Sequence, residues 1–204
     1  MAWFGLLAVV ISYLIGSIST STLLVRWISG RDIRSVGSGN AGATNTMRTL
    51  GLKWGVLVLV FDGLKGAIAL WIADALVPHG TWALALSAVA VVVGHNWPVF
   101  FGFRGGKGIA TTIGVLLWLA PLPAVIAGLV CLAVIAVTRY VSLGSLVFVC
   151  LVPILIVAFR FEGWIFAASV ALALLAVYRH RSNIDRLLHG TERRIFDRTS
   201  EGVR

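Results

Sequence analysis

Glycine, hydroxyl, amide and basic residues are concentrated in two short stretches of the chain, residues 37–48 and 94–108. Glycine permits positive φ angles and close backbone approach, so successive N–H groups in such a stretch can surround an anion. Arginine and lysine add charged donors that match phosphate oxygens. Both stretches are therefore predicted to bind phosphate groups.

The first stretch carries the larger number of donors. A short helix over 41–50, stopped by Gly51, would direct its N-terminus at a bound anion. The glycines at 37, 39 and 42 also fit a dinucleotide-binding fingerprint, but that motif follows a β-strand, and here an apolar segment precedes it. A flexible loop whose arginines meet lipid headgroups is the alternative. The candidate binding residues are Gly37, Ser38, Gly39, Asn40, Asn45 and Arg48.

The second stretch places Lys107 among Gly105, Gly106 and Gly108, where an apolar segment begins, and carries His95 near its start. Exposed glycine amides beside an ammonium group would suit a second phosphate or oxyanion. The stretch does not match a nucleotide-triphosphate loop, because a phenylalanine replaces the first glycine of that motif. A basic turn that only anchors the neighbouring span is the alternative.

Polar residues also occur within or beside other apolar segments. Asp62 and Lys65 stand three residues apart on one helical face inside or near the bilayer, where ionisable side chains are usually paired or functional. Direct substrate contact and a supporting ion pair both remain open. His180 and Asn183 share a face if the last helix continues through them, and a solvated basic helix end is the alternative. Ser142 offers a hydroxyl in a short turn.

The remainder of the chain predicts an all-α integral membrane protein. Of 204 residues, 59% are hydrophobic and 12% are charged, a composition outside the range of soluble domains. The apolar segments predict a bundle of about seven short transmembrane helices in a single domain over 1–204, and a five-span arrangement would merge or remove some. Pro121 and Pro123 mark one turn. The segments are 3–25, 52–77, 82–101, 108–120, 122–137, 142–159 and 163–178.

Basic residues set the expected orientation. They concentrate in 26–51, 94–108, 138–142 and the tail 179–204. Because basic loops favour the cytoplasmic side, the N-terminus is predicted to lie outside and the C-terminus in the cytoplasm. The net charge of +9 points to anionic lipids or an anionic substrate, and nucleic acid is a poor candidate for so hydrophobic a chain. The sequence shows no cluster of metal ligands and no cofactor motif.

These motifs, taken together and in this order, closely resemble one family. The pattern is similar to the bacterial acyl-phosphate-dependent glycerol-3-phosphate acyltransferases, the PlsY family. Departures are mild, since Trp97 and Arg104 stand where phenylalanine and lysine are expected. The residues that carry the resemblance are Asp32 to Arg34 with Gly37 to Arg48, Asp62 to Gly66, Gly94 to Gly108, Val141 to Ser145, and Tyr178 to Ile184 with Glu192.

The resemblance implies transfer of a fatty acyl group from acyl phosphate to the 1-hydroxyl of sn-glycerol 3-phosphate. The products would be lysophosphatidic acid and inorganic phosphate, in the first acylation of phospholipid biosynthesis. The site would face the cytoplasm at the inner membrane, among membrane lipids. By this resemblance the reaction centre is expected to contain Ser38, Arg48, Lys107, His180 and Asn183. Asn45, His95, Ser142 and the glycines of both loops are expected to contact substrate or to shape the loops.

Several alternatives stay open at this point. The hydroxyl proton could pass to His180 or to a substrate phosphate oxygen, and Ser38 could instead act as an acylated nucleophile. A transporter of a small phosphate ester and a nonenzymatic binder of anionic lipids would also use basic loops. A transporter is expected to show repeated halves with broken helices near the midplane, and neither is apparent in the sequence.

Overall fold

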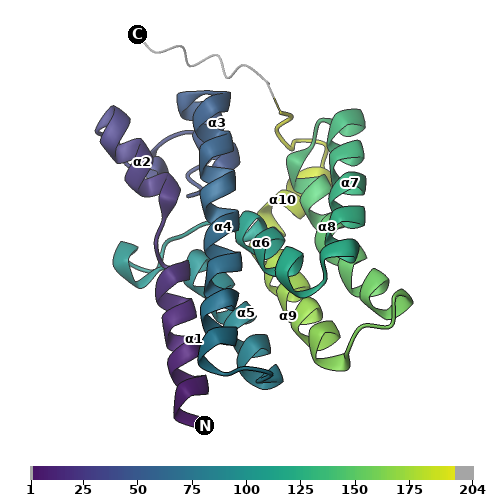
Figure 1. Cartoon of the computed structure of the whole chain (residues 1–204). Coiled ribbons are helices and arrows are strands. Elements are labelled where there is room, and N and C mark those ends of the chain that lie inside the picture. The colour runs from purple at the N-terminus through teal and green to yellow at the C-terminus, as the bar shows by residue number, and fades with distance from the viewer. Residues whose placement is uncertain (1, 196–204) are drawn as a thin grey trace.

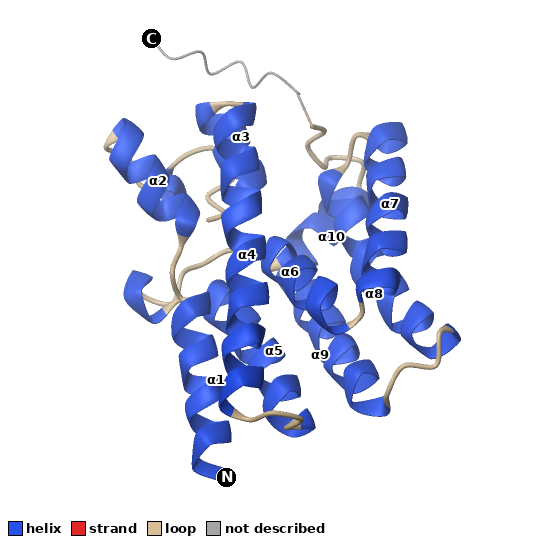
Figure 2. Ribbon diagram, in the orientation of Figure 1, coloured by secondary structure: helices blue, strands red, loops and turns tan. Residues whose placement is uncertain are grey.

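The computed structural model describes residues 2–195, and this part of the chain is built from helices without strands (Figures 1 and 2). Residues 196–204 of the predicted cytoplasmic tail lie outside the described residues. The α-helices are α1 Ala2–Gly16, α2 Thr20–Ser29, α3 Ala43–Leu50, α4 Leu52–Leu76, α5 Thr81–Asn96, α6 Ile109–Leu119, α7 Pro121–Thr138, α8 Val141–Ala158, α9 Gly163–Arg179 and α10 Arg181–Leu188. Short 3-10 turns occupy η1 Ile33–Ser35 and η2 Val99–Phe101.

The all-α membrane architecture is confirmed. Five helical stretches are long and apolar enough to cross a bilayer, and α9 with α10 makes a sixth if that bent pair is one span. With eleven residues, α6 is shorter than the ~20 needed to cross the hydrocarbon by itself. Each of the seven predicted apolar segments contains an α-helix, while the number of segments that span the membrane and the direction of the termini stay predictions.

The first segment was expected to be one helix over 3–25; it lies within one apolar stretch, Trp3–Ser29, long enough to cross a bilayer, but the expectation of an uninterrupted helix is wrong. The helix stops at Gly16, and α2 begins only at Thr20. Gly16 lies against the backbone of Val91 in α5, so closely that a Cβ at Gly16 would overlap the Val91 carbonyl. Beyond it, the Ile18 carbonyl accepts a hydrogen bond of 2.8 Å from the Lys65 ammonium group instead of continuing the helix. The break in the helix therefore leaves the Ile18 carbonyl available as an acceptor for the Lys65 ammonium group in α4.

Other local predictions from the sequence are confirmed. The short helix α3 ends at Gly51, whose φ of 96° is accessible mainly to glycine. The boundary between α6 and α7 falls at Ala120, and Pro121 opens α7 at a position where a missing N–H costs little. Asp62 and Lys65 lie on one buried face of α4, as their spacing indicates.

The helices pack in two groups that meet along α4, α5, α6 and α9 (Figure 1). In the first group, α1 packs on α4 and α5, and in the second α8 packs on α7 and α9. Large apolar side chains such as Leu132, Ile154 and Leu174 remain more than 60% exposed on the outer surface. Such exposure is expected of a surface that contacts lipid tails, because apolar side chains have no unfavourable free energy of exposure to hydrocarbon.

Glycines allow α4 and α6 to approach closely. A Cβ at Gly114 in α6 would overlap the Gly63 carbonyl oxygen in α4, and a Cβ at Gly66 would overlap the Thr111 carbonyl oxygen. Small residues at such crossings are the common means of packing helices in lipid. This contact fixes the start of α6 beside the polar residues of α4.

We expect Gly114→Ala to lower the free energy of unfolding by about 1–3 kcal/mol, because the added methyl group must displace a backbone carbonyl. Gly128→Ala is the matched control, since a Cβ at that position of α7 meets no atom within 4 Å. Thermal unfolding of both variants in one detergent gives the comparison. Equal midpoints for the two variants would contradict a tight α4–α6 contact.

Candidate active site

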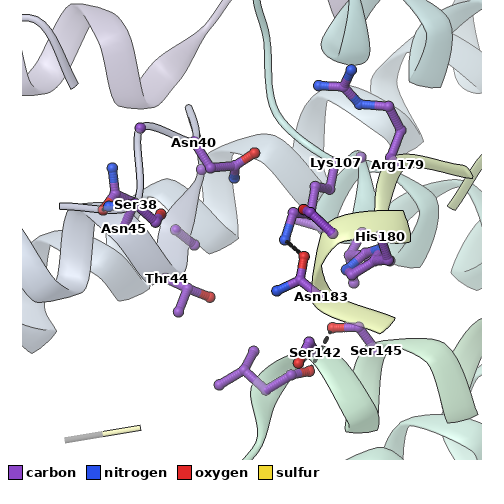
Figure 3. Close-up of a pocket in the computed structure, with 18 of the residues that line it drawn as sticks. Ser38, Asn40, Thr44, Asn45, Lys107, Ser142, Ser145, Arg179, His180 and Asn183 are labelled. Carbon is purple, nitrogen blue, oxygen red and sulfur yellow. Dashed lines mark hydrogen bonds between the residues drawn. The ribbon is translucent and has the colours of Figure 1, made fainter. Parts of the chain in front are cut away.

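A polar cavity of about 590 Å³ lies where the first loop meets the beginning of α6 and the segments 141–145 and 179–193. Figure 3 shows its side chains converging from these segments. The predicted site residues that line it are Gly37, Ser38, Gly39, Asn40, Asn45, Arg48, Asp62, His95, Gly105, Lys107, Gly108, Ser142, His180 and Asn183. Gly106 and Lys65 support the cavity from behind and are not among its lining residues.

Four helices begin at this cavity. Residues from the first turns of α3, α6, α8 and α10 all line it, among them Thr44, Ala110, Ser142 and Asn183. The first N–H groups of a helix have no partner inside that helix, and the helix dipole favours negative charge there. The cavity is therefore suited to anions by its backbone as well as by its side chains.

Asn45 shapes the first loop. The residue is 1% exposed, and its side chain accepts a hydrogen bond of 2.8 Å from the Ser38 N–H. Its amide nitrogen donates to the carbonyls of Ile33 and Val36, at 3.1 and 3.0 Å. A Cβ at Gly37, where φ is 62°, would overlap the Asn45 side chain. Of the two roles expected for Asn45, these contacts favour loop geometry.

The second loop corrects one expectation. The N–H groups of Gly105 and Gly106 were expected to be exposed to an anion, but they donate to the Asn96 and His95 carbonyls at 3.2 and 3.1 Å. The carbonyls of the same two glycines accept hydrogen bonds from the Arg179 guanidinium group, the shortest being 2.7 Å. These glycines thus hold the loop against α5 and α9, and they place Lys107 at the cavity.

Arg34 ties the two loops together. Its guanidinium group makes a bidentate ion pair with Asp32, with a shortest distance of 2.6 Å, and donates to the Phe101 carbonyl at 2.7 Å. The planar guanidinium fork makes this double contact possible, and lysine could not reproduce it. Asp32 and Arg34 belong to the motif that carries the family resemblance. In the structure, their ion pair and the bond to Phe101 connect the first loop to the second.

A network around Glu192 orients the opposite wall. Lys107 donates to the Asn183 side-chain oxygen, and the Asn183 amide donates to Glu192 at 2.6 Å. Ser142 and Arg186 also donate to Glu192, each at 2.7 Å. Burial alone would raise the pKa of Glu192, but these three hydrogen bonds outweigh it and lower the pKa. In this structure Ser142 contacts a carboxylate of the protein.

His180 lies at the bend of 62° between α9 and α10, so the helix does not continue straight through it. Its Nδ1 is 2.7 Å from the Ala176 carbonyl oxygen. A carbonyl can only accept, so Nδ1 carries the proton and Nε2 of the neutral ring is an acceptor. Burial, with a contribution from Lys107, lowers the pKa of His180 to about 4, and the ring is neutral at pH 7.

The cavity has a strong excess of positive charge. Only two acidic side chains line it among the described residues, Asp62 and Glu192, and each has a cationic partner. Burial and the nearby arginines lower the pKa of Lys107 to about 8, although Glu192 acts in the opposite direction. A bound anion would offset this cost. The basic lining residues are Arg48, Lys107, Arg179, Arg181, Arg186 and Arg193.

Sequence reasoning did not assign several of these residues to the site. Arg179 and Arg186 belong to a run of basic residues that the positive-inside rule explains equally well. Nothing in the sequence therefore distinguished them, as site residues, from the other arginines of the tail. Ser145 lines the cavity about one helical turn after the predicted residue Ser142. Because residues on one face of a helix recur at three or four positions, Ser145 could have been inferred from Ser142.

The fold and the cavity define an integral membrane protein with a basic polar cavity at the N-termini of several helices. A sequence model of the family "Glycerol-3-phosphate acyltransferase" matches residues 6–190. A glycerol-3-phosphate acyltransferase from Halalkalibacterium halodurans is 50% identical over 196 residues, which cover 94% of this chain and 95% of the relative. The chain belongs to the glycerol-3-phosphate acyltransferase family.

Two solved structures share this fold. Both are of PlsY (YgiH), an integral membrane glycerol 3-phosphate acyltransferase, and both cover 93% of this chain and 94% of their own. The glycerol 3-phosphate form is 41% identical with a TM-score of 0.89, and the lysophosphatidic acid form is 38% identical with a TM-score of 0.85. The resemblance inferred from the sequence motifs is thereby confirmed.

Lys107 predicts a pH dependence for anion binding. With its pKa lowered to about 8, the charged form is present below pH 8 and is lost above it. We expect affinity for inorganic phosphate to fall by up to about 10-fold between pH 8 and pH 9.5, because deprotonation then approaches completion. The measurement is equilibrium dialysis of the detergent-solubilised protein with labelled phosphate.

Lys107→Arg is the control for this dialysis, because arginine stays charged throughout the range. Its affinity for phosphate should be nearly constant from pH 7 to pH 9.5. A parallel loss of binding in both proteins would exclude Lys107 as the titrating group.

Proposed function

We propose that this protein transfers a fatty acyl group from acyl phosphate to the 1-hydroxyl of glycerol 3-phosphate, giving lysophosphatidic acid and inorganic phosphate. The observation that carries the proposal is the junction of two surfaces. The polar cavity shares Leu59 and Ala110 with an apolar groove of about 390 Å³ between α4 and α6. A donor with a phosphate head and a hydrocarbon tail fits both surfaces at once.

The apolar groove suits the tail of the donor. It is lined by small residues such as Gly63, Ala67 and Gly114 and by larger apolar side chains such as Leu64, Ile113 and Trp118. Hydrocarbon in the groove would continue from the bilayer to the edge of the polar cavity. The acyl carbonyl carbon would then lie near Leu59 and Ala110, where the basic side chains begin.

The cavity can support the reaction by positioning and by charge. The 1-hydroxyl oxygen attacks the acyl carbonyl carbon, and the bond between that carbon and the phosphate oxygen breaks. Acyl phosphate is already activated, so orientation and stabilisation of developing charge supply most of the catalysis. Arg48, Lys107 and the helix N-termini hold the phosphate groups, and Ser38 donates a hydrogen bond to a substrate oxygen.

His180 orients the hydroxyl group in this scheme. Its Nε2 is an acceptor, because Nδ1 donates to the Ala176 carbonyl. A pKa lowered to about 4 makes His180 a weak base at neutral pH. The phosphate group is the better proton acceptor, and inorganic phosphate leaves with the hydroxyl proton. Of the two alternatives for the proton, this arrangement favours the substrate phosphate.

The proposed location is the inner membrane, with the cavity facing the cytoplasm. Basic residues gather at the end of the bundle that holds α3 and α10, and the N-terminal end of α1 lies at the opposite end (Figure 1). The positive-inside rule places the basic end in the cytoplasm. Glycerol 3-phosphate would enter from there, and acyl phosphate would enter from the bilayer.

The proposal is tested by incubating the purified protein in lipid or detergent with palmitoyl phosphate and labelled glycerol 3-phosphate, with acyl-CoA as a parallel donor. We expect lysophosphatidic acid from acyl phosphate and none from acyl-CoA. Arg48→Ala should reduce kcat/KM by at least about 100-fold, since it removes a charged contact to phosphate. Absence of product from acyl phosphate would refute the proposal.

The groove gives a separate prediction about the donor. Gly63→Leu places a side chain in the groove, and the Cβ itself makes only an ordinary contact of 3.6 Å with the Ala110 carbonyl oxygen. We expect KM for palmitoyl phosphate to rise about 10-fold or more. The leucine side chain would exclude methylene groups of the acyl chain from the groove, and burial of each contributes ~0.8 kcal/mol. KM for glycerol 3-phosphate should stay constant.

Gly128→Leu is the control for this kinetic measurement, because position 128 lies on α7, away from the groove, with open space around its Cβ. Both KM values of this variant should match the wild type. A Gly63→Leu enzyme with an unchanged KM for palmitoyl phosphate would place the acyl chain elsewhere.

A further inference from the structure

Lys65 makes three polar contacts with its ammonium group, all within the protein. Nζ is 2.9 Å from the Asp62 carboxylate, 2.8 Å from the Ile18 carbonyl oxygen and 3.0 Å from His95 Nδ1. The side chain is 9% exposed, and the carboxylate beside it stabilises the charged form. An ammonium group has three N–H donors and no acceptor. The third donor therefore goes to His95, and Nδ1 must accept it.

This contact fixes the proton of the neutral His95 ring on Nε2. His95 is 6% exposed and lines the polar cavity. Its Nε2 faces Gly106, where an added Cβ would overlap it, on the side where the Ala41 carbonyl also lies. Within residues 2–195 no protein atom accepts a hydrogen bond from Nε2. His95 Nε2 is not among the fully buried side-chain atoms that lack a partner, so its N–H is accessible and is available to a ligand in the cavity that His95 lines.

The position of the ring indicates which ligand. Nδ1 of His95 is 3.8 Å from the Asp62 carboxylate, and Asp62 stands one helical turn after Leu59 on α4. Leu59 is one of the two residues shared by the polar cavity and the apolar groove. The His95 ring thus lies beside the junction where the proposed function places the acyl phosphate head.

We infer that Lys65 is a positioning residue that holds His95 in the Nε2–H tautomer, and that His95 donates this N–H to an oxygen of the acyl phosphate head. The inference rests on the proposed function for the identity of the ligand. It assigns the Asp62–Lys65 pair to support of the site, with the substrate contact made by His95.

The two buried histidines of the cavity then have opposite tautomers. His180 donates through Nδ1 to the Ala176 carbonyl and presents Nε2 as an acceptor, whereas His95 accepts at Nδ1 and presents Nε2–H as a donor. The first suits a substrate hydroxyl and the second suits an anionic oxygen. Each tautomer is set by a group of the protein behind the ring.

The tautomer is tested directly by nitrogen NMR of the full chain with labelled histidine in detergent micelles. We expect the Nδ1 of His95 to give the signal of a nitrogen without a proton and Nε2 the signal of a protonated one. His180 should show the reverse and serves as an internal control. The signals are assigned by their loss in His95→Gln and His180→Gln. A protonated Nδ1 in His95 would overturn the inference.

Kinetics of two substitutions then separate the ring nitrogens. The amide nitrogen of His95→Gln lies near the position of Nε2 and keeps a donor there, while His95→Asn keeps polar atoms only near Nδ1, beside Lys65. We expect KM for palmitoyl phosphate to rise by about 10- to 100-fold in His95→Asn and by several-fold less in His95→Gln. KM for glycerol 3-phosphate should change little. Equal losses in the two variants, or a loss confined to glycerol 3-phosphate, would overturn the inference.

A third variant tests Lys65 without leaving a buried charge. Asp62→Asn combined with Lys65→Met removes both charges and keeps similar volumes, and such exchanges are often tolerated where single ones are not. We expect a mixture of His95 tautomers and a higher KM for palmitoyl phosphate. An unchanged tautomer of His95 and an unchanged KM for palmitoyl phosphate would show that Lys65 does not position His95.

Failure of the inference and failure of the proposed function give different results. If the wild-type protein forms no lysophosphatidic acid from acyl phosphate, the function is refuted, and with it the ligand assigned to His95, whatever the tautomer. If the wild type is active and the variants of His95 behave alike, only the inference is refuted.

Discussion

A phosphate group carries charge that hydrocarbon cannot solvate, and the cationic groups that hold it face the same difficulty at the edge of the bilayer. This cost explains why basic side chains at and behind the site have polar partners within the protein. Lys65 is surrounded by Asp62, the Ile18 carbonyl and His95. Arg179 is held by the carbonyls of the second loop, and Arg186 by Glu192. The break between α1 and α2 and the path of the second loop both follow from these pairings.

Local chemistry was readable from the sequence wherever the residues act within a few positions of one another. Gly51 at the end of α3 and the spacing of Asp62 and Lys65 both led to correct local predictions. The errors arose from contacts across the chain. No local pattern indicates that the Gly105 and Gly106 amides bond to α5, or that Val91 closes on Gly16. Tertiary contacts decide such points, and a single sequence does not contain them explicitly.

The two glycine-rich loops, alike in composition, have different tasks. In the first, Asn45 accepts from the Ser38 N–H and ties the loop to the carbonyls of Ile33 and Val36, which leaves the side chains of the loop directed at the cavity. In the second, the glycines are required because α5 and His95 leave no room for a Cβ. The first loop thus provides groups for a ligand, while the second brings Lys107 and the beginning of α6 into place.

Binding of an acyl phosphate is governed by the place where polar and apolar surfaces meet. The bond that breaks in such a donor lies between its tail and its phosphate, so it must lie at the boundary between the two surfaces. In this protein that boundary is formed by Leu59 of α4 and Ala110 of α6, two helices whose approach depends on Gly63, Gly66 and Gly114. In the proposed reaction, helix packing in the bilayer therefore sets the position of the reacting carbon relative to Lys107 and His180. A shift of α6 along α4 would separate the tail from the charges even if every polar side chain were retained, since precise placement of the reacting atoms supplies much of the rate.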